Sequence, residues 1–324
     1  MHALSRAALA AVTRPRAASH RAALAATAFF IAAFVACERE DEPRSAALVV
    51  ADSDTVLADL PGTPGEDADR AIFEDRVRWA LENRLDILPI GQIVARVGRT
   101  FVGTRYVPGV LDVPGEERLI VNLRELDCVT YVENMLAMAR LIRQRNTDFD
   151  DFRRELTRIR YRDGIVAGYP SRLHYFSEWI SDGERKGILR DITRELGGIP
   201  DPEPINFMST HASSYAALAA PENLAAIRDI EQRLSARPRY FIPEDRIAEA
   251  APRIQDGDII AATAAVPGLD IVHTGIALHV GDQLHLMHAP LVGKNVEISE
   301  LPLARRIQSI DGQDGIMVAR PLEP

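Results

Sequence analysis

Cys128 and a C-terminal group of histidines are the residues of this chain best suited to do chemistry. The chain has two cysteines, Cys37 and Cys128. Four of its eight histidines gather in one stretch near the C-terminus: His273, His279, His285 and His288. A thiol that loses its proton to a neighbouring imidazole is a strong nucleophile, so these residue types predict acyl transfer through a thioester.

Cys128 precedes a stretch with the spacing of an amphipathic helix. Apolar residues recur three or four positions apart after it, and Asp127 before it is a favourable N-cap residue, so we expect a helix over 126–143. The unpaired N–H groups and the macrodipole at a helix start favour the thiolate. Asp127 opposes this electrostatically unless its carboxylate turns away to cap the helix. The position permits an activated thiol, and a buried cysteine that packs as a small apolar residue is the alternative.

The strand pattern around the histidines selects His273 and His288. In "HTGIALHV", Thr274 and the apolar residues after it share one face, whereas His273 lies on the other face beside small residues. A turn at "GDQ" would form a hairpin that places His288 beside His273, where it can set the tautomer of the imidazole. Cys128, His273 and His288 are therefore candidates for nucleophile, base and orienting group.

His279 and His285 are interpreted as ordinary core or surface histidines. A zinc site built from the histidine cluster is a further alternative, but no acidic or cysteine ligand stands at helical or hairpin spacing from it. The pattern thus favours thiol chemistry without a metal.

The elements that must position these residues change along the chain. A helical pattern starts at Asp67, a short helix is expected over 90–99, and "RLIVNL" (118–123) has the pattern of a short strand. Helices and loops follow between 150 and 236, and short β-type runs separated by turns fill 237–324. Helices first and strands last predict an α+β fold, in which the nucleophile helix packs on a C-terminal antiparallel sheet or small barrel.

Composition excludes several classes of protein. With 324 residues, 47% of them apolar, the chain can form one large domain or two small ones. Its net charge of −9 argues against nucleic-acid binding and against attraction to anionic lipid. The sequence contains no Gly-rich phosphate loop and no CxxC, HExxH, GxSxG or SxxK motif, which removes the enzyme classes that depend on them.

The N-terminal segment is typical of an exported lipoprotein. Basic residues precede the apolar run "AALAATAFFIAAFVAC", which is short for a membrane span and has the layout of an export signal. Its end, "FVAC", resembles a lipobox, in which Cys37 becomes the lipidated first residue of the mature protein. A plain cleaved signal or an N-terminal anchor is the alternative. Glu38 does not signal inner-membrane retention, so we expect an outer-membrane lipoprotein that faces the periplasm.

Three regions follow from this interpretation. Residues 1–37 form the signal peptide, and 38–66 are acidic with Pro/Gly punctuation, as in a flexible tether. Residues 67–324 form a single domain, mainly helical to residue 236 and mainly β from residue 237. If Cys37 carries lipid, Cys128 has no partner for a structural disulfide.

Several sequence blocks in this domain are similar to a known family. "LDCVTYVENMLAMA", "IRYRDG…SRLHYFSEWI", "DGDIIAAT…GLDIVHTGIAL…LHLMHA" and "GIMVARP" resemble the N-acetylmuramoyl-L-alanine amidase-like family. That family, once a domain of unknown function, lies in the NlpC-type branch of papain-like cysteine hydrolases. The similarity runs from about residue 90 to the C-terminus. It implies a papain-like fold with Cys128 as nucleophile, His273 as base and His288 as orienting group, and no metal or organic cofactor.

The resemblance also implies residues that contact substrate. Asp127 would shape the substrate-binding end of the cleft. The signature blocks of the family further contain Tyr106, Arg172, His174 and Tyr175. We expect Arg172 to meet the acidic peptide of the substrate. The chain has "HTG" where "HVG" is usual and "HAP" where "HAS" is usual, and Pro290 removes a hydroxyl and an N–H near the cleft.

The implied reaction is hydrolysis of an amide in peptidoglycan or its muropeptide fragments. The bond would join the lactyl group of N-acetylmuramic acid to L-Ala of the stem peptide. A γ-D-glutamyl–diaminopimelate endopeptidase would use the same triad and is the first alternative. A lipoprotein that binds peptidoglycan fragments without cutting them is the second. In each case the partner is peptidoglycan, and the membrane is contacted through the lipid anchor.

Overall fold

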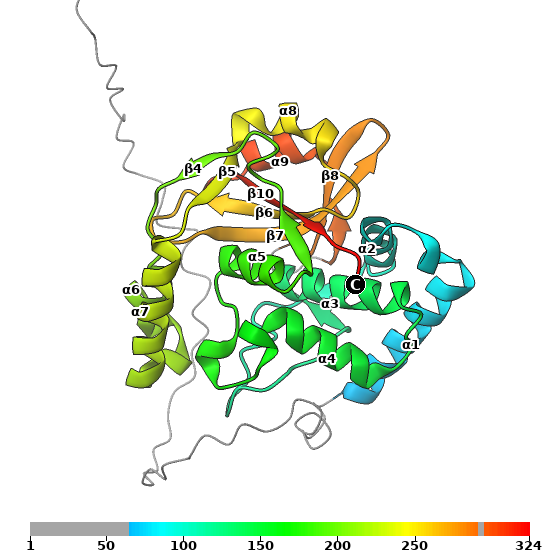
Figure 1. The fold of residues 1–324 in the computed structure, drawn as a ribbon, viewed down its shortest axis with the longest axis horizontal. Coiled ribbons are helices and arrows are strands. Elements are labelled where there is room, and N and C mark those ends of the chain that lie inside the picture. The colour runs from blue at the N-terminus through cyan, green and yellow to red at the C-terminus, as the bar shows by residue number, and fades with distance from the viewer. Residues whose placement is uncertain (1–64, 291–294) are drawn as a thin grey trace, which may run out of the picture. The chain divides into compact units, whose positions relative to one another are not determined.

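An antiparallel sheet of eight strands organises the C-terminal half of the computed structural model (Figure 1). The structure describes residues 65–290 and 295–324, so the predicted signal peptide, Cys37 and nearly all of the predicted tether lie outside the described residues. The strands of this sheet are β3 (Leu189–Asp191), β4 (Ile199–Asp201), β5 (Arg239–Pro243), β6 (Ile259–Ala264), β7 (Ile271–Val280), β8 (Gln283–His288), β9 (Glu297–Ile298) and β10 (Gln313–Pro321). Their order is β4-β5-β10-β6-β7-β8-β9, and β3 pairs with β10.

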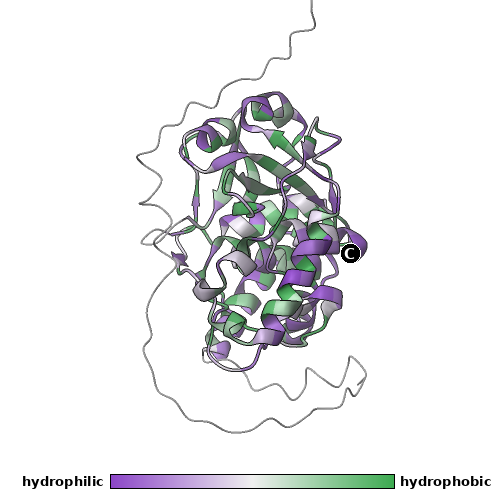
Figure 2. Cartoon of the chain, turned by 90° about the vertical axis from the view of Figure 1, so that its left-hand side faces the viewer, coloured by the Kyte–Doolittle hydropathy of each residue, from purple (hydrophilic) through white to green (hydrophobic). Residues whose placement is uncertain are grey.

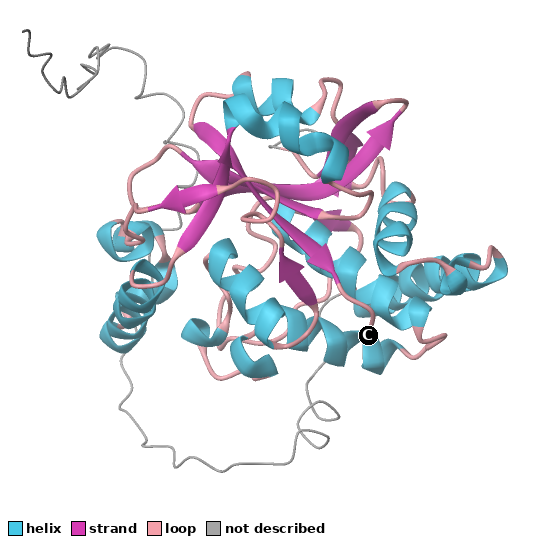
Figure 3. Cartoon of the chain, turned by 45° about the horizontal axis from the view of Figure 1, so that its top comes forward, coloured by secondary structure: helices cyan, strands magenta, loops and turns pink. Residues whose placement is uncertain are grey.

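Helices cover both faces of this sheet (Figures 1 and 3). They are α1 (Glu66–Glu82), α2 (Ile90–Arg99), α3 (Cys128–Arg143), α4 (Phe149–Arg160), α5 (Phe176–Arg185), α6 (Phe207–Thr210), α7 (Pro221–Ser235), α8 (Ile247–Ala250) and α9 (Leu303–Gln308). In the view of Figure 1, α8 and α9 lie above the sheet and α3 and α5 lie below it. Among the described residues, no helix combines the length and the hydropathy that a bilayer span requires.

Short segments connect these elements. The strands β1 (Arg105–Tyr106) and β2 (Glu125–Leu126) form a separate parallel pair. The 3₁₀ turns are Leu85–Ile87, Arg162–Gly164, Tyr169–Ser171, Ala212–Ser214, Ala216–Ala219, Glu244–Arg246 and Ala251–Arg253.

The helix α3 is the centre of the larger hydrophobic core. Every residue from 130 to 142 is buried, including the apolar positions that predicted the helix. A helix that is buried on all sides must satisfy its charged groups internally, and Glu133 accepts a hydrogen bond from Arg160 at 2.7 Å. The predicted helix over 126–143 is thus confirmed, with its first helical residue at Cys128.

The sheet has one apolar face against α2 and α3 and another against α8 and α9. Ile276 and Leu278 of β7 belong to the core around α3, whereas Ala277 between them belongs to the core that contains Leu303 and Ile307 of α9. This alternation follows the two-residue period of a strand. Figure 2 shows the apolar segments between the layers and the polar ones outside.

Most of the predicted elements are present with small shifts. The helix expected from Asp67 starts at Glu66, and α2 covers 90–99 as predicted. The sheet is antiparallel, as expected. The two halves of the domain are less separate than predicted, because β3 and β4 of the helical half join the sheet and the helices α8 and α9 belong to the β half.

The prediction of a strand over 118–123 is wrong. The segment has no ladder partner, although Leu119, Val121 and Leu123 are buried. The Leu123 N–H donates to the buried carboxylate of Asp69 at 2.8 Å, so a side chain replaces a strand as acceptor. Apolar residues in this segment indicated burial and not strand pairing.

Candidate active site

A capping box fixes Cys128 as the first residue of α3. The Asp127 carboxylate accepts hydrogen bonds from the Thr130 N–H at 2.7 Å and from the Thr130 hydroxyl at 2.8 Å. The Asp127 N–H donates to the Thr130 hydroxyl at 2.9 Å. The predicted N-cap is therefore present, and it is strengthened by a reciprocal bond that orients the chain as it enters the helix.

The start of α3 is tied to the strand that carries His273. The Thr274 hydroxyl donates to the carbonyl oxygen of Cys128 at 2.8 Å, across 146 positions of the chain. The threonine of "HTG", which stands where valine is usual in the family, thus joins the start of α3 to the strand that carries His273. Within the described residues Cys128 forms no disulfide.

His273 and His288 form the histidine pair that the hairpin predicted. The Nε2 atom of His273 lies 2.8 Å from Nδ1 of His288, and the two rings are perpendicular. His288 is 2% exposed, so this contact is shielded from water. Because Nε2 of His273 is used by His288, its Nδ1 atom is the nitrogen left to take a proton from a thiol.

A bulge in β7 stands directly before His273. His273 pairs with Ala262 and Ile271 pairs with Thr263, so Val272 is an additional residue on β7. Bulges bend a strand and redirect the side chains next to them, and they are common beside active sites. The alternation of β7 is therefore interrupted at the residue next to the candidate base.

The environment of the thiol and the imidazole favours their uncharged forms. Burial and the neighbouring charge of Asp127 raise the pKa of Cys128 to about 11. Burial and the positive charge of Arg306 lower the pKa of His273 to about 3. Both side chains are half-buried by accessible area, yet enough protein surrounds them to disfavour charge. The helix start therefore does not produce a resting thiolate, because desolvation and the charge of Asp127 outweigh the influence of Thr274, which acts in the opposite direction.

Tyr106 lies near the nucleophile because β1 pairs with β2. Tyr106 is opposite Leu126, the residue before the N-cap, and the Val107 N–H donates to the Leu126 carbonyl at 3.1 Å. Burial raises the pKa of Tyr106, and the charges of Cys128 and Asp127 raise it further. Because its pKa is raised, the Tyr106 hydroxyl stays protonated at neutral pH and can donate a hydrogen bond near the thiol.

Arg172 and His174 lie in a buried network whose partners are protein groups. The Arg172 guanidinium lies 3.0 Å from the Asp112 carboxylate and 3.4 Å from that of Glu117. The Nε2 atom of His174 hydrogen-bonds the carbonyl of Tyr169 at 2.9 Å, and burial together with Arg172 lowers the pKa of His174 to about 3. Arg172 is thus already neutralised by two carboxylates, which weakens its expected role toward an acidic peptide.

Tyr175 has a structural role in place of the substrate contact expected of it. Its side chain is 2% exposed, and its hydroxyl donates to Glu231 at 2.7 Å and accepts from the Met208 N–H at 2.9 Å. These bonds connect the start of α5 to α6 and α7. The donor of this buried hydroxyl is therefore already used by Glu231, which weakens the expected substrate contact.

Two residues near the site were not found from the sequence. Glu297 of β9 lies opposite His288, with 3.8 Å between its Oε1 and the Nε2 of His288. Arg306 of α9 acts electrostatically on His273, and the charge of Cys128 acts in turn on Arg306. Neither belongs to a motif with a fixed spacing to Cys128, so only the pairing of strands and the placement of α9 reveal them.

The two remaining strand histidines have structural partners, as interpreted from the sequence. His285 is buried, and its Nδ1 hydrogen-bonds the Ser299 carbonyl at 2.8 Å. His279 hydrogen-bonds Asp256 through both its backbone N–H and its Nδ1 atom, each at 2.7 Å. Within residues 65–290 and 295–324, no group of three or more His, Cys, Asp or Glu side chains has the arrangement of a metal site.

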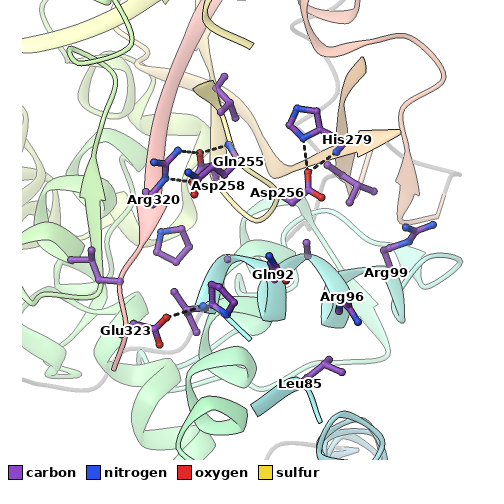
Figure 4. A pocket seen from close by; sticks show the side chains of 18 of the residues that line it. Leu85, Gln92, Arg96, Arg99, Gln255, Asp256, Asp258, His279, Arg320 and Glu323 are labelled. Carbon is purple, nitrogen blue, oxygen red and sulfur yellow. Dashed lines mark hydrogen bonds and ion pairs between the residues drawn. The ribbon is translucent and has the colours of Figure 1, made fainter. Parts of the chain in front are cut away.

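A cavity of about 1250 Å³ opens at the His279 end of β7 (Figure 4). Its lining includes His279, Asp256 and Arg320, but not the three triad candidates. Some of its charged groups pair with one another, as Figure 4 shows for His279 with Asp256 and for Arg320 with Asp258 at 2.7 Å. The candidates His273 and His288 lie toward the other end of this hairpin.

Comparison with known proteins gives a family for the chain. The model of a family described as AmiA-like, N-acetylmuramoyl-L-alanine amidase-like, matches residues 96–316. A crystal structure of an N-acetylmuramoyl-L-alanine amidase from Bacteroides uniformis ATCC 8492 is similar, with 38% identity, a TM-score of 0.68, and coverage of 72% of this chain and 99% of that chain. None of the curated proteins matches.

Two further solved structures are similar. A Bacteroides fragilis protein provisionally named a xylanase has 41% identity and a TM-score of 0.66, with 69% of this chain and 98% of that chain covered. Protein LPG0564 from Legionella pneumophila has 18% identity and a TM-score of 0.57, over 79% of this chain and 95% of that chain, which shows a shared fold. From the family match and the B. uniformis structure, the chain belongs to the N-acetylmuramoyl-L-alanine amidase-like family.

Proposed function

We propose that the protein is a cysteine-dependent N-acetylmuramoyl-L-alanine amidase of papain-like, NlpC-type architecture. It would cleave the amide between the lactyl group of N-acetylmuramic acid and L-Ala in peptidoglycan or muropeptides. The observation that carries this proposal is the hydrogen bond between His273 and His288. Thr274, the residue after His273, binds the carbonyl of Cys128. The strand position next to His273 is thereby tied to the start of the nucleophile helix, which supports His273 as the base for Cys128.

The pKa shifts favour a reaction that begins from an uncharged pair. Nδ1 of His273 takes the thiol proton of Cys128 while the sulfur attacks the lactyl carbonyl carbon. The C–N bond then breaks, the sulfur keeps the acyl group as a thioester, and the protonated His273 gives its proton to the leaving amine of L-Ala. A water molecule hydrolyses the thioester, with His273 again as base, and restores the thiol.

The oxyanion of each tetrahedral intermediate requires donors near the sulfur. The Cys128 N–H at the start of α3 is one such donor, because the first N–H groups of a helix have no intrahelical acceptor. The protonated hydroxyl of Tyr106 is the second donor that we propose. His288, with Glu297 on its far side, would hold the His273 ring in one orientation.

The decisive experiment compares the wild-type domain with Cys128→Ala on purified muropeptides and measures product masses. The proposal predicts a muramic-acid-containing sugar plus an intact stem peptide from the wild type, and no product from Cys128→Ala. Cleavage inside the stem peptide would instead identify the γ-D-glutamyl–diaminopimelate endopeptidase. Binding without cleavage would identify a peptidoglycan-binding protein, and persisting hydrolysis by Cys128→Ala would overturn the thiol mechanism.

We further propose that residues 1–37 direct export and that Cys37 carries the lipid that anchors the protein to the outer membrane. The support is the lipobox-like sequence "FVAC". Metabolic labelling with a radioactive fatty acid tests this: the wild-type chain should incorporate label and Cys37→Ser should not. Equal labelling of both chains would contradict the anchor.

A further inference from the structure

Arg306 is a half-buried arginine whose guanidinium has no anionic partner among the described residues. Its Nη1 atom is shielded from solvent and makes no hydrogen bond. Comparable arginines in this protein are paired: Arg160 with Glu133 at 2.7 Å and Arg320 with Asp258 at 2.7 Å. Burial lowers the pKa of Arg306, and the nearby charge of Glu297 offsets this effect only in part.

The placement of α9 brings this cation to the active site. Leu303 and Ile307 of α9 pack in the same core as Ala277 of β7, on the sheet face opposite α3. The positive charge of Arg306 lowers the pKa of His273, and a thiolate at Cys128 would oppose the lowering of the pKa of Arg306. Arg306 is therefore within electrostatic reach of both reacting groups.

The neighbouring acid, Glu297, does not neutralise Arg306. It lies within electrostatic range of the guanidinium, but no ion pair joins the two among the described residues, and its carboxylate lies 3.8 Å from His288. Arg172, the arginine that the sequence suggested for this purpose, already contacts Asp112 and Glu117. Of these two arginines, Arg306 is the one without an ion pair among residues 65–290 and 295–324, and we take it as the candidate to receive an anion.

We propose that Arg306 recognises a carboxylate of the substrate on the leaving-peptide side of the scissile amide. This inference rests on the proposed amidase function, because the acyl side of that bond is an uncharged lactyl sugar and the acidic residues belong to the peptide. A guanidinium binds a carboxylate through two parallel hydrogen bonds, which gives both charge and orientation. Arg306 would thus position the peptide so that the amide carbonyl meets the sulfur.

Binding of the carboxylate would also change the base. A substrate anion beside Arg306 cancels part of the positive field that acts on His273, so the pKa of His273 rises and the imidazole accepts a proton more readily. An acidic peptide would thus strengthen the base that cleaves it, whereas a neutral analogue would leave the base weak.

The test uses two muramoyl peptides that differ in one group, a free or an amidated α-carboxylate on the second peptide residue. The wild-type domain should cleave the free acid with a kcat/KM about tenfold to a hundredfold higher than the amide, the range for hydrogen bonds to a charged group. In Arg306→Gln this ratio should fall to about one, and Arg306→Lys should retain part of it. The exposed neighbour Arg305 on the same helix provides the matched control, and Arg305→Gln should keep the wild-type ratio.

Binding separates this inference from the proposed reaction. Calorimetry with Cys128→Ser should show tighter binding of the free acid than of the amide, and Cys128→Ser/Arg306→Gln should not discriminate. If the wild type cleaves neither peptide, the proposed function fails while this binding difference still tests Arg306. A preference for the free acid that survives Arg306→Gln, or an equal loss of kcat on both peptides in a variant with unchanged thermal unfolding, would overturn the inference.

Discussion

The two ends of β7 carry histidines that the sequence places on the same face of the strand, yet their surroundings differ. His273 lies beside a bulge, contacts His288, and is followed by the threonine that holds Cys128. His279, six residues later, forms two hydrogen bonds with Asp256 at the rim of a wide cavity. Each histidine keeps one ring nitrogen outside these bonds, but only His273 stands next to the residue that binds the Cys128 carbonyl. The neighbours, and not the residue type, distinguish the two ends.

The largest effect on activity should come from removing the histidine at the His273 end of β7, compared with removing the one at the His279 end. His273→Ala should lower kcat/KM on muropeptides about 10³-fold or more, because general base and general acid steps both disappear. His279→Ala should leave kcat/KM near the wild-type value. Product mass and initial rates measure both, and an equal loss in the two variants would contradict the assignment of chemistry to the His273 end.

A smaller effect is expected at His288, which orients the base without contacting the reacting atoms. His288→Ala should lower kcat about 10²-fold with little change in KM, since a misoriented imidazole still binds substrate but transfers the proton poorly. His288→Asn, which keeps a hydrogen-bonding side chain, should recover part of the rate. A change confined to KM would place His288 in substrate binding.

The pH profile tests the environment of the pair. Because the pKa of His273 is lowered to about 3, its base form should persist at pH 5, where an ordinary histidine would be mostly protonated. The rate at pH 5 should therefore stay close to that at pH 7, instead of falling about thirtyfold as a base of ordinary pKa would require. Alkylation of Cys128 by iodoacetamide should be slow at pH 6 and rise toward pH 11, since its pKa is raised to about 11. Fast alkylation at pH 6 would instead show a resting thiolate.

The smallest effect concerns the bond that joins the nucleophile helix to β7. Thr274→Val introduces the residue that is usual in the family and leaves the Cys128 carbonyl without its 2.8 Å donor. We expect the free energy of unfolding to fall by about 1 kcal/mol, the typical net value of one hydrogen bond, and kcat to fall only a few-fold. Urea unfolding measures this change, with Thr147→Val at an exposed threonine as the control, and an unchanged stability would show that the bond is dispensable.

Local patterns in the sequence were sufficient to predict the nucleophile helix α3 and the hairpin of β7 and β8. The apolar spacing after Cys128, the capping residue Asp127 and the alternation of β7 each depend on neighbours within a few positions. Such short-range order is set by backbone geometry, so α3 and the approach of His288 to His273 followed from the chain alone. The same patterns did not predict the bulge at Val272, because a bulge depends on how β6 and β7 pair.

Roles that depend on long-range pairing were decided by the tertiary structure. Tyr175 and Arg172 lie in the signature blocks of the sequence. In the structure the Tyr175 hydroxyl donates a hydrogen bond to Glu231. The Arg172 guanidinium forms ion pairs with Asp112 and Glu117. The segment 118–123 is buried but unpaired, and its partner Asp69 stands 54 positions away from Leu123. Polar side chains acquire a role from the atoms that surround them after folding, and no local spacing records those atoms.

By itself the sequence determined the fold class, the helix that begins at Cys128 and the candidate triad with His273 and His288, because each rests on a periodicity or on a family motif. Only the tertiary structure decided which charges remain available. It neutralised Arg172, left Arg306 without an anionic partner among the described residues, and placed thiol and imidazole where burial holds both uncharged. Desolvation and ion pairing are sums over all surrounding atoms, so they exist only once α9, β7 and α3 have packed together.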